Sequence, residues 1–456
     1  MSKPNDVDEF LKDFIDELKL VSNGYKLGEH LIPVHTASFI CDAPARQFFK
    51  RITSHNGYSG CERCQQVGEY EAGTVVFPEL NSLPRSDENF LAQSDSNHHR
   101  GISPLAKLNM TNCLVSKFVL DPMHLVYLGV MRKLLNLWLK GPLNVRIGSH
   151  KKNLISKNLV NVAKFMPAEF NCKPRSLDEL DRFKANESRS FLLYTGPVVL
   201  KDTTDINIYN NFMLLFSAVN LLSRKDIPNS VEYAKDYLLK FTEHFIQIYG
   251  KRYAVYNVRN LWHLPDDVAK HGTLDSFSAF EFENFLGVIK NLLRKPNFPL
   301  SQVINRISER NISMDVEEHI YPVLKKIHAQ GPLVDEMVCQ QYKELYLEKY
   351  CFKVTPADQG VMINNEIGCI QNIISNKCEP NNISIIYQVY QVKEIVFHYP
   401  LSSANLGIYK VKGSVRFEDR KNMKNITFCE KKNMWLGYTL AIISQRFMVK
   451  HAILLV

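Results

Sequence analysis

Four side chains in this chain are of types that take part in phosphate chemistry, and they occupy informative positions. Asp42 ends the apolar run 31–41, and Asp121 and His124 begin a helical segment. Glu283 lies inside a later amphipathic segment. Carboxylates of this kind hold hard divalent cations in enzymes that cut phosphodiesters. Taken singly, the same residues cap helices or form turns, and their spacing alone does not choose between these roles.

A second set of residues has the spacing of a metal site. Cys61 and Cys64 are separated by two residues, which suits two thiolates on one tetrahedral zinc ion. Two cysteines bind zinc poorly alone, so histidine ligands are required nearby. The neighbouring histidines are His55, His98 and His99, and we predict the ligand set His55, Cys61, Cys64 and His99. The alternative is an inert thiol pair in a loop.

The elements that must position these residues can be read from the hydrophobic pattern. Apolar residues recur every three or four positions over 7–20, which predicts a helix. The run 31–41 is rich in β-branched and aromatic residues and predicts a strand with Asp42 at its carboxyl end. Helical periodicity dominates 121–310, and β-type composition follows residue 356.

Composition limits the class of protein. With 456 residues and 45% hydrophobic residues, the chain is long enough for two or three globular domains. The formal net charge of +9 is compatible with a nucleic-acid partner. The ten cysteines are too scattered for a disulfide framework. No apolar run reaches the length of a membrane span, and we predict no membrane partner.

The order of these motifs resembles the CACTA (En/Spm-like) DNA transposases over about residues 4–412. The resemblance implies a ribonuclease-H-like fold in which three carboxylates bind Mg²⁺ and cut and join transposon ends. It assigns Asp42 as the second acid and Glu283, in Phe282-Glu283-Asn284, as the third. Glu281 is the rival for the third position, but the family usually has proline there.

The resemblance also gives expectations for the other motifs. Asp121-x2-His124 matches an acid-x2-His motif that lies beside the catalytic acids, although a helix cap explains Asp121 equally well. His263 falls in a family-like stretch, where a satisfied core histidine is the expected role. Candidate DNA contacts are the basic residues Arg46, Lys50, Arg51 and Arg294.

The first catalytic acid of the family lies in an Asp-Gly context on a strand, and no Asp-Gly precedes Asp42. We therefore expect a transposase-derived chain that lacks the amino-terminal part of the core and is catalytically inactive. The alternative is a domesticated DNA- or chromatin-binding protein without catalysis. For both alternatives we expect a nuclear protein that binds DNA, and a homo-oligomer is compatible with either one.

The predicted fold class is α+β, with a truncated ribonuclease-H-like α/β core, a large helical insertion and a small β-rich carboxyl-terminal domain. The first two segments are the core remnant at 1–60 and a cysteine/histidine loop region at 61–120. A helical insertion with the third-acid helix follows at 121–310, then a helical connector at 311–355 and the β-rich domain at 356–456.

Overall fold

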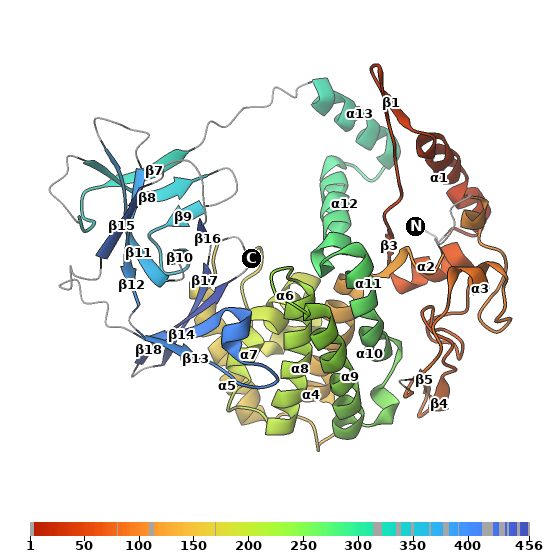
Figure 1. Cartoon of the computed structure of the whole chain (residues 1–456), viewed down its shortest axis with the longest axis horizontal. Helices are drawn as coiled ribbons and strands as arrows, with labels where there is room; N and C mark the ends of the chain where they lie inside the picture. Colours follow the sequence, from red (N-terminus) through yellow and green to blue (C-terminus); the bar gives the residue numbers. More distant parts are fainter. Residues whose placement is uncertain are drawn as a thin grey trace. The chain divides into compact units, whose positions relative to one another are not determined.

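The computed structural model shows a mixed helical and β-stranded protein (Figure 1). It describes residues 4–79, 81–108, 114–168, 170–312, 322–333, 339–347, 351–363, 366–376, 383–390, 392–412, 423–427, 434–435, 437–444 and 447–454. The chain forms two compact units, each built from two separate stretches of sequence. Unit 1 contains residues 1–147 and 205–291, and unit 2 contains 148–204 and 292–456. This division differs from the five consecutive segments that the sequence predicted.

Unit 1 begins with helix α1 (Val7–Ser22), which confirms the helix predicted over 7–20. Asp6 caps α1 by accepting a hydrogen bond from the backbone N–H of Asp8. The apolar face of α1 buries Val7, Leu11 and Ile15 in a cluster that includes residues of the later loop and strand.

The strand predicted over 31–41 is divided in two, which corrects the prediction. Strand β2 (His30–Ile32) forms a hairpin with β1 (Tyr25–Leu27), and β3 (Phe39–Cys41) is a separate strand. Pro33 lies directly after β2 and has no N–H to continue a ladder. Strand β3 pairs in parallel with β6 (Phe118–Leu120), and the rings of Phe39 and Phe118 stack with centroids 4.8 Å apart.

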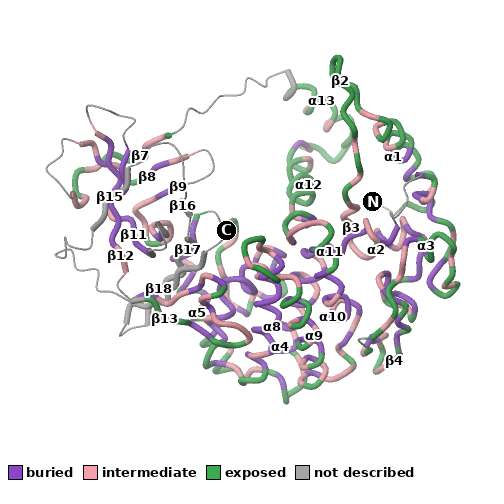
Figure 2. The backbone as a smooth tube through the Cα atoms, viewed as in Figure 1, coloured by how far each residue is buried: buried purple, intermediate pink, exposed green. Residues whose placement is uncertain are grey.

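The centre of unit 1 is helical. Helix α8 (Ile206–Leu222) is apolar on nearly all sides and buried along its length, as the purple tube in Figure 2 shows. It packs against α9 (Ser230–Tyr249). Its Phe212 ring also meets Trp138 of α4 (Arg132–Lys140), with ring centroids 6.0 Å apart, and α4 continues the π-helix η2 (Met123–Met131). The remaining helices and strands of unit 1 are α2 (Ala43–Lys50), β4 (Glu69–Glu71), β5 (Thr74–Val76), α3 (Asp87–Leu91), η1 (Pro104–Lys107), η6 (Lys251–Tyr253), α10 (Tyr256–Asn260), η7 (Leu261–His263), α11 (Leu264–His271), η8 (Leu274–Phe277) and α12 (Phe280–Leu292).

Unit 2 combines short helices with antiparallel β-sheets. Its helices are α5 (Ser149–Val162), η3 (Ala163–Phe165), η4 (Leu177–Arg182), α6 (Ala185–Ser190), η5 (Phe191–Thr195), α7 (Gly196–Val199), α13 (Pro299–Ile312) and η9 (Ser403–Leu406). Its strands are β7 (Val323–His328), β8 (Cys339–Tyr346), β9 (Cys351–Lys353), β10 (Gly360–Ile363), β11 (Glu366–Asn376), β12 (Ile383–Val389), β13 (Val392–Ile395), β14 (Ile408–Lys412), β15 (Met423–Thr427), β16 (Met434–Trp435), β17 (Gly437–Ser444) and β18 (Phe447–Leu454). Strands β13, β14, β18 and β17 form a four-stranded sheet, and the others form an eight-stranded one.

A helical connector was predicted over 311–355. In the described part of that segment α13 ends at Ile312, and β7, β8 and β9 then form a ladder in place of the predicted helix. Leu345 and Phe352 pair across β8 and β9 and are buried, whereas Tyr346 and Lys353, the next residues along the two strands, lie on the other face and are half-buried. This alternation with period two is the strand pattern, and the abundance of charged residues concealed it. The broad α+β class is confirmed. No helix among the described residues is long and apolar enough to cross a membrane.

Candidate functional site

Asp42 and Asp121 occupy equivalent positions in unit 1, at the carboxyl ends of two neighbouring parallel strands. Asp42 directly follows β3, and Asp121 directly follows β6, which is paired with it. Such strand ends are where binding sites form in α/β proteins. The Asp42 carboxylate accepts one hydrogen bond, at 2.8 Å from the backbone N–H of Ala45, and so caps α2. Its second oxygen accepts no protein hydrogen bond within the described residues.

Asp121 is almost completely buried, and protein donors use its whole accepting capacity. Oδ1 accepts from the backbone N–H groups of Met123 and Ala279, at 3.1 and 2.8 Å. Oδ2 accepts from the backbone N–H of His124 and from its Nδ1. A carboxylate offers about four lone-pair positions, so Asp121 has none left for a metal ion. Its role is to join β6, η2 and the start of α12.

His124 connects this buried carboxylate to Glu283. The imidazole donates through Nδ1 to Asp121, and its Nε2 lies 3.7 Å from Oε1 of Glu283 on α12. The hydrogen bond to Asp121 raises the pKa of His124 above its ordinary value, and the negative charges of Asp121, Asp42 and Glu283 raise it further. The four residues named from the sequence are therefore close enough to share one electrostatic environment.

Cys61 and Cys64 lie in a loop that the fold holds firmly. Gly60 ends a tight turn, and a Cβ at this position would stand 2.4 Å from the carbonyl oxygen of Ser54, which only glycine avoids. Arg63, between the two cysteines, donates to the carbonyl of Phe118 on β6 and to Asp267 on α11, at 2.6 and 2.7 Å. The loop is thereby attached to both β6 and the segment that carries His263.

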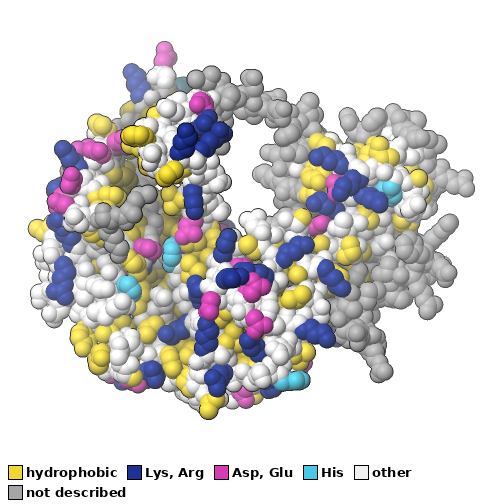
Figure 3. Space-filling model, turned by 180° about the vertical axis from the view of Figure 1, so that it is seen from behind, with side chains coloured by type: hydrophobic (Ala, Val, Ile, Leu, Met, Phe, Trp, Pro, Cys, Tyr) yellow, Lys and Arg dark blue, Asp and Glu magenta, His cyan; other side chains and the backbone are white. Residues whose placement is uncertain are grey.

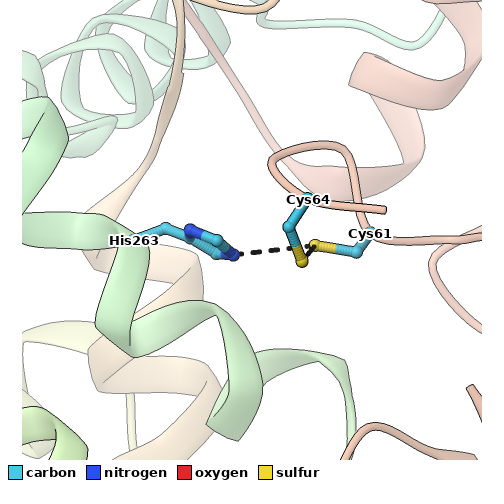
Figure 4. Close-up of side chains that lie close together, drawn as sticks. All are labelled: Cys61, Cys64 and His263. Carbon is cyan, nitrogen blue, oxygen red and sulfur yellow. Dashed lines mark hydrogen bonds between the residues drawn. The ribbon is translucent and has the colours of Figure 1, made fainter. Parts of the chain in front are cut away.

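The thiols of Cys61 and Cys64 face the imidazole of His263 (Figure 4). The two sulfurs are 3.4 Å apart, and Sγ of Cys61 lies 3.8 Å from Nε2 of His263. All three ligand atoms lie within 4.8 Å of one another, and all three residues are buried. Two thiolates on one zinc at about 2.3 Å are roughly 3.8 Å apart, so little movement would be needed to receive an ion. This group could hold a metal ion, and its sulfur and imidazole donors suit zinc.

The surroundings favour one thiolate over the other. The hydrogen bond between the two thiols and the positive charge of Arg259 lower the pKa of Cys64 to about 6, although burial opposes them. The same hydrogen bond and burial raise the pKa of Cys61 to about 12. The side-chain amide oxygen of Asn260, three residues before His263, lies 3.8 Å from Sγ of Cys61 and accepts from this thiol. It is a further oxygen atom near the group that could contact a metal ion.

The predicted histidine ligands lie elsewhere. Nδ1 of His55 contacts the side chain of Gln47, and Nδ1 of His98 donates to the carbonyl oxygen of Ser59 at 2.7 Å. The ring of His99 packs against Phe90, with centroids 4.5 Å apart. None of the three belongs to the cysteine group among the described residues. His263 takes the place assigned to them, and the family-like stretch around it was the one signal in the sequence.

Two of the predicted DNA contacts are buried, and the structure gives them another role. Arg46 and Lys50 lie on α2 with 4% and 0% of their surface exposed. Both contact Glu62, Arg46 through Nε at 2.6 Å and Lys50 through Nζ at 3.0 Å. Tyr256 donates to the same carboxylate at 2.8 Å. Their positive charges therefore balance a buried carboxylate, and a DNA phosphate cannot reach them.

The other two predicted DNA contacts remain at the surface. Arg51 is partly exposed and pairs with Asp8 on α1. Arg294 follows α12 and is exposed.

A surface cavity of about 470 Å³ in unit 1 opens beside His263, with Arg63, Asp267 and Lys270 in its lining. The imidazole of His263 is therefore shared between this cavity and the two thiols.

Comparison with known proteins relates one part of the chain to a described family. Residues 327–449, in the β-rich part of unit 2, match the model of a family described as a domain of unknown function (DUF8592). A comparison with curated proteins finds no match. Unit 1, which contains both residue groups described above, lies outside the matched segment.

Proposed function

We propose that this chain derives from a DNA transposase of the CACTA type, with a ribonuclease-H-like core, and that it binds DNA without cutting it. The observation that carries the proposal is the meeting of Asp42, Asp121, His124 and Glu283 at the carboxyl ends of β3 and β6. These residues come from segments far apart in sequence. Carboxylates gathered at such a position are the donors that phosphodiester cleavage by two metal ions requires.

The donor set does not fit two divalent cations. Asp121 has no free lone pair, and one oxygen of Asp42 caps α2. Of the three carboxylates in this group, Glu283 is the one whose two oxygens both accept no hydrogen bond from the described residues. Two Mg²⁺ ions about 4 Å apart need bridging and flanking oxygens to offset their mutual repulsion. This arrangement therefore supports the proposal of a transposase-derived protein that has lost metal-dependent DNA cleavage.

A plasmid-nicking assay tests this proposal. Supercoiled DNA is incubated with the full chain and Mg²⁺ or Mn²⁺, and the expected result is no conversion above a sample without protein. The decisive variants are Glu283→Gln and its matched control Glu281→Gln, which removes an exposed carboxylate two residues away on α12. Metal-dependent nicking that Glu283→Gln abolishes and Glu281→Gln preserves would show that the chain is an active nuclease.

The non-catalytic form of the proposal is a domesticated DNA- or chromatin-binding protein of the nucleus, as a monomer or a homo-oligomer. The saturation of Asp121 favours this form. Binding that depends on phosphate contacts weakens steeply with salt. Fluorescence anisotropy with labelled DNA should therefore show affinity that falls as salt rises. Absence of binding at low salt would contradict a DNA-binding role.

We also propose that Cys61, Cys64 and His263 hold a structural zinc ion. Their burial and soft donors support this, since structural zinc sites are closed and built from sulfur and nitrogen. Purified protein should carry about one zinc by elemental analysis, lost in Cys61→Ser and strongly reduced in His263→Gln. The matched controls are His55→Gln and His99→Gln, which should keep the metal. Metal loss in these controls, with His263→Gln unaffected, would restore the ligand set predicted from the sequence.

A further inference from the structure

The outer face of the three-stranded ladder β7–β8–β9 in unit 2 carries an ordered row of charges. Lys325 of β7 pairs with Glu344 of β8, and Glu344 pairs with Lys353 of β9. Tyr346, two residues beyond Glu344, lies on the same face because alternate residues of a strand share a side. Nζ of Lys325 is 4.8 Å from the centroid of the Tyr346 ring, and Nζ of Lys353 is 5.9 Å from it.

The opposite face of this ladder belongs to the core. Leu345 and Phe352 have 0% and 2% of their surface exposed, and they pack in one cluster with Ile373 and Ile385. The ladder is therefore amphipathic, and hydrophobic packing fixes which side faces outward. The row of lysines is a consequence of the register and cannot turn inward without exposing the buried side chains.

Lys326 adds a third ammonium group to this outer face. Its backbone has a φ of +59°, in the left-handed region that non-glycine residues rarely adopt. By strict alternation its side chain would belong to the core side, yet its Nζ lies 2.6 Å from Glu344. Left-handed backbone is unfavourable for a lysine, and residues held in it cluster at functional sites such as ligand clamps.

The negative charge on this face is already used. The Glu344 carboxylate receives the ammonium group of Lys326 and, at 3.1 Å, the hydroxyl of Tyr346. Within the described part of the chain, Lys325 and Lys353 contact the Tyr346 ring and form no ion pair of their own. Figure 3 shows basic side chains gathered around an acidic one on the β-rich part of unit 2. The face therefore carries three ammonium groups, those of Lys325, Lys326 and Lys353, and one carboxylate, that of Glu344, so positive charge is in excess.

The chemistry of the face favours phosphate over carboxylate as its ligand. Lysine ammonium groups are compact point charges that contact phosphate oxygens from many directions, whereas planar recognition of carboxylates typically uses the arginine fork. The row of Lys325, Glu344 and Lys353 contains no arginine. Lysines two strands apart are roughly 10 Å from each other along the sheet, which suits successive contacts along a chain of phosphates. An aromatic ring among basic residues is a common feature of surfaces that bind single strands.

We propose that the outer face of β7–β9, formed by Lys325, Lys326, Tyr346 and Lys353, contacts the phosphodiester backbone of DNA. This face lies in unit 2, partly within the segment that matches the domain of unknown function. It gives that segment a binding role that is separate from the carboxylate group of unit 1.

The salt dependence of DNA binding tests this inference. Anisotropy of a labelled 30-nucleotide strand and of its duplex is measured with the full chain at several salt concentrations. The double variant Lys325→Gln/Lys353→Gln removes two phosphate contacts, so the slope of log Kobs against log salt should fall by about 1.4 for the single strand or about 1.8 for the duplex. The matched control Lys151→Gln/Lys157→Gln removes two exposed lysines of α5 and should keep the wild-type slope.

Each outcome decides a different statement. A wild-type protein that does not bind DNA refutes both the proposed function and this inference. A protein that binds DNA with the same slope in the double variant refutes the inference alone. Displacement of DNA by polyglutamate at equal charge concentration would instead assign the face to an acidic protein. Circular dichroism and the thermal midpoint of the variants should match wild type, because all four substitutions are at the surface.

Discussion

Replacing Asp121 by asparagine should destabilise unit 1 far more than its size suggests. The carboxamide keeps one accepting oxygen and replaces the other by an NH₂ donor. With its oxygen toward the N–H groups of Met123 and Ala279, the new NH₂ faces His124. The imidazole can change tautomer and accept through Nδ1, but the backbone N–H of His124 cannot.

The magnitude follows from these contacts. One donor facing another donor costs about 1–3 kcal/mol, and loss of the negative charge weakens the other three hydrogen bonds by roughly 0.5–1 kcal/mol each. The expected total for Asp121→Asn is about 4 kcal/mol. The matched control is Asp42→Asn, the same substitution after the neighbouring strand. Asparagine keeps an oxygen that accepts the single capping hydrogen bond from the backbone N–H of Ala45, so the expected cost is below about 0.5 kcal/mol.

Two measurements check this difference. Urea unfolding is followed by tryptophan fluorescence in a Trp435→Phe background, where the remaining tryptophans, Trp138 and Trp262, both belong to unit 1 and report its free energy of unfolding. Hydrogen exchange of the peptide that spans 279–290 reports the attachment of α12, because Asp121 holds the N–H of Ala279 directly before that helix. The reasoning fails if Asp121→Asn costs no more than Asp42→Asn, or if exchange in α12 is unchanged.

Two further predictions concern charge. Glu62→Gln leaves two buried cations without a counter-charge and should lower the free energy of unfolding by about 3–5 kcal/mol. The control Glu69→Gln, at the exposed pair with Lys251, should leave it unchanged, both measured by urea unfolding. Burial raises the pKa of Glu62, but its cationic partners outweigh this and lower it, so its stabilisation is present above the unfolded pKa, near 4.3, and is lost as pH falls. The raised pKa of His124 reverses the sign: its stabilisation is full below about 6.5 and is lost as pH rises through the folded pKa. NMR titration should show a lower His124 pKa in Glu283→Gln than in wild type, and an unchanged His124 pKa in Glu281→Gln. An equal decrease in both variants would contradict a specific contact between His124 and Glu283.

Local pattern was sufficient for the parts of the protein that depend on nearest neighbours in sequence. The apolar spacing over 7–20 identified α1, and the helical periodicity over 121–310 indicated the region that contains α8, α9 and α12, since burial of one face requires a period near 3.6 residues. The two-residue separation of Cys61 and Cys64 likewise placed the sulfurs within reach of one ion, as the distance of 3.4 Å shows. These features involve contacts that short-range geometry already determines.

Only the tertiary structure decided which partners these residues meet. His263 reaches the cysteines through the packing of α10 and η7 against their loop, and no spacing in the sequence records that distance. Arg46 and Lys50 look like exposed DNA contacts in sequence, yet Glu62 and burial turn them into core charges. In sequence, Asp121 is a plausible metal ligand. In the structure the backbone N–H of Ala279, 158 residues later in the chain, donates to its Oδ1, and no lone pair remains for a metal ion. Side-chain chemistry is local, but burial and partner choice arise from the packing of distant segments, and these determine what the chemistry can do.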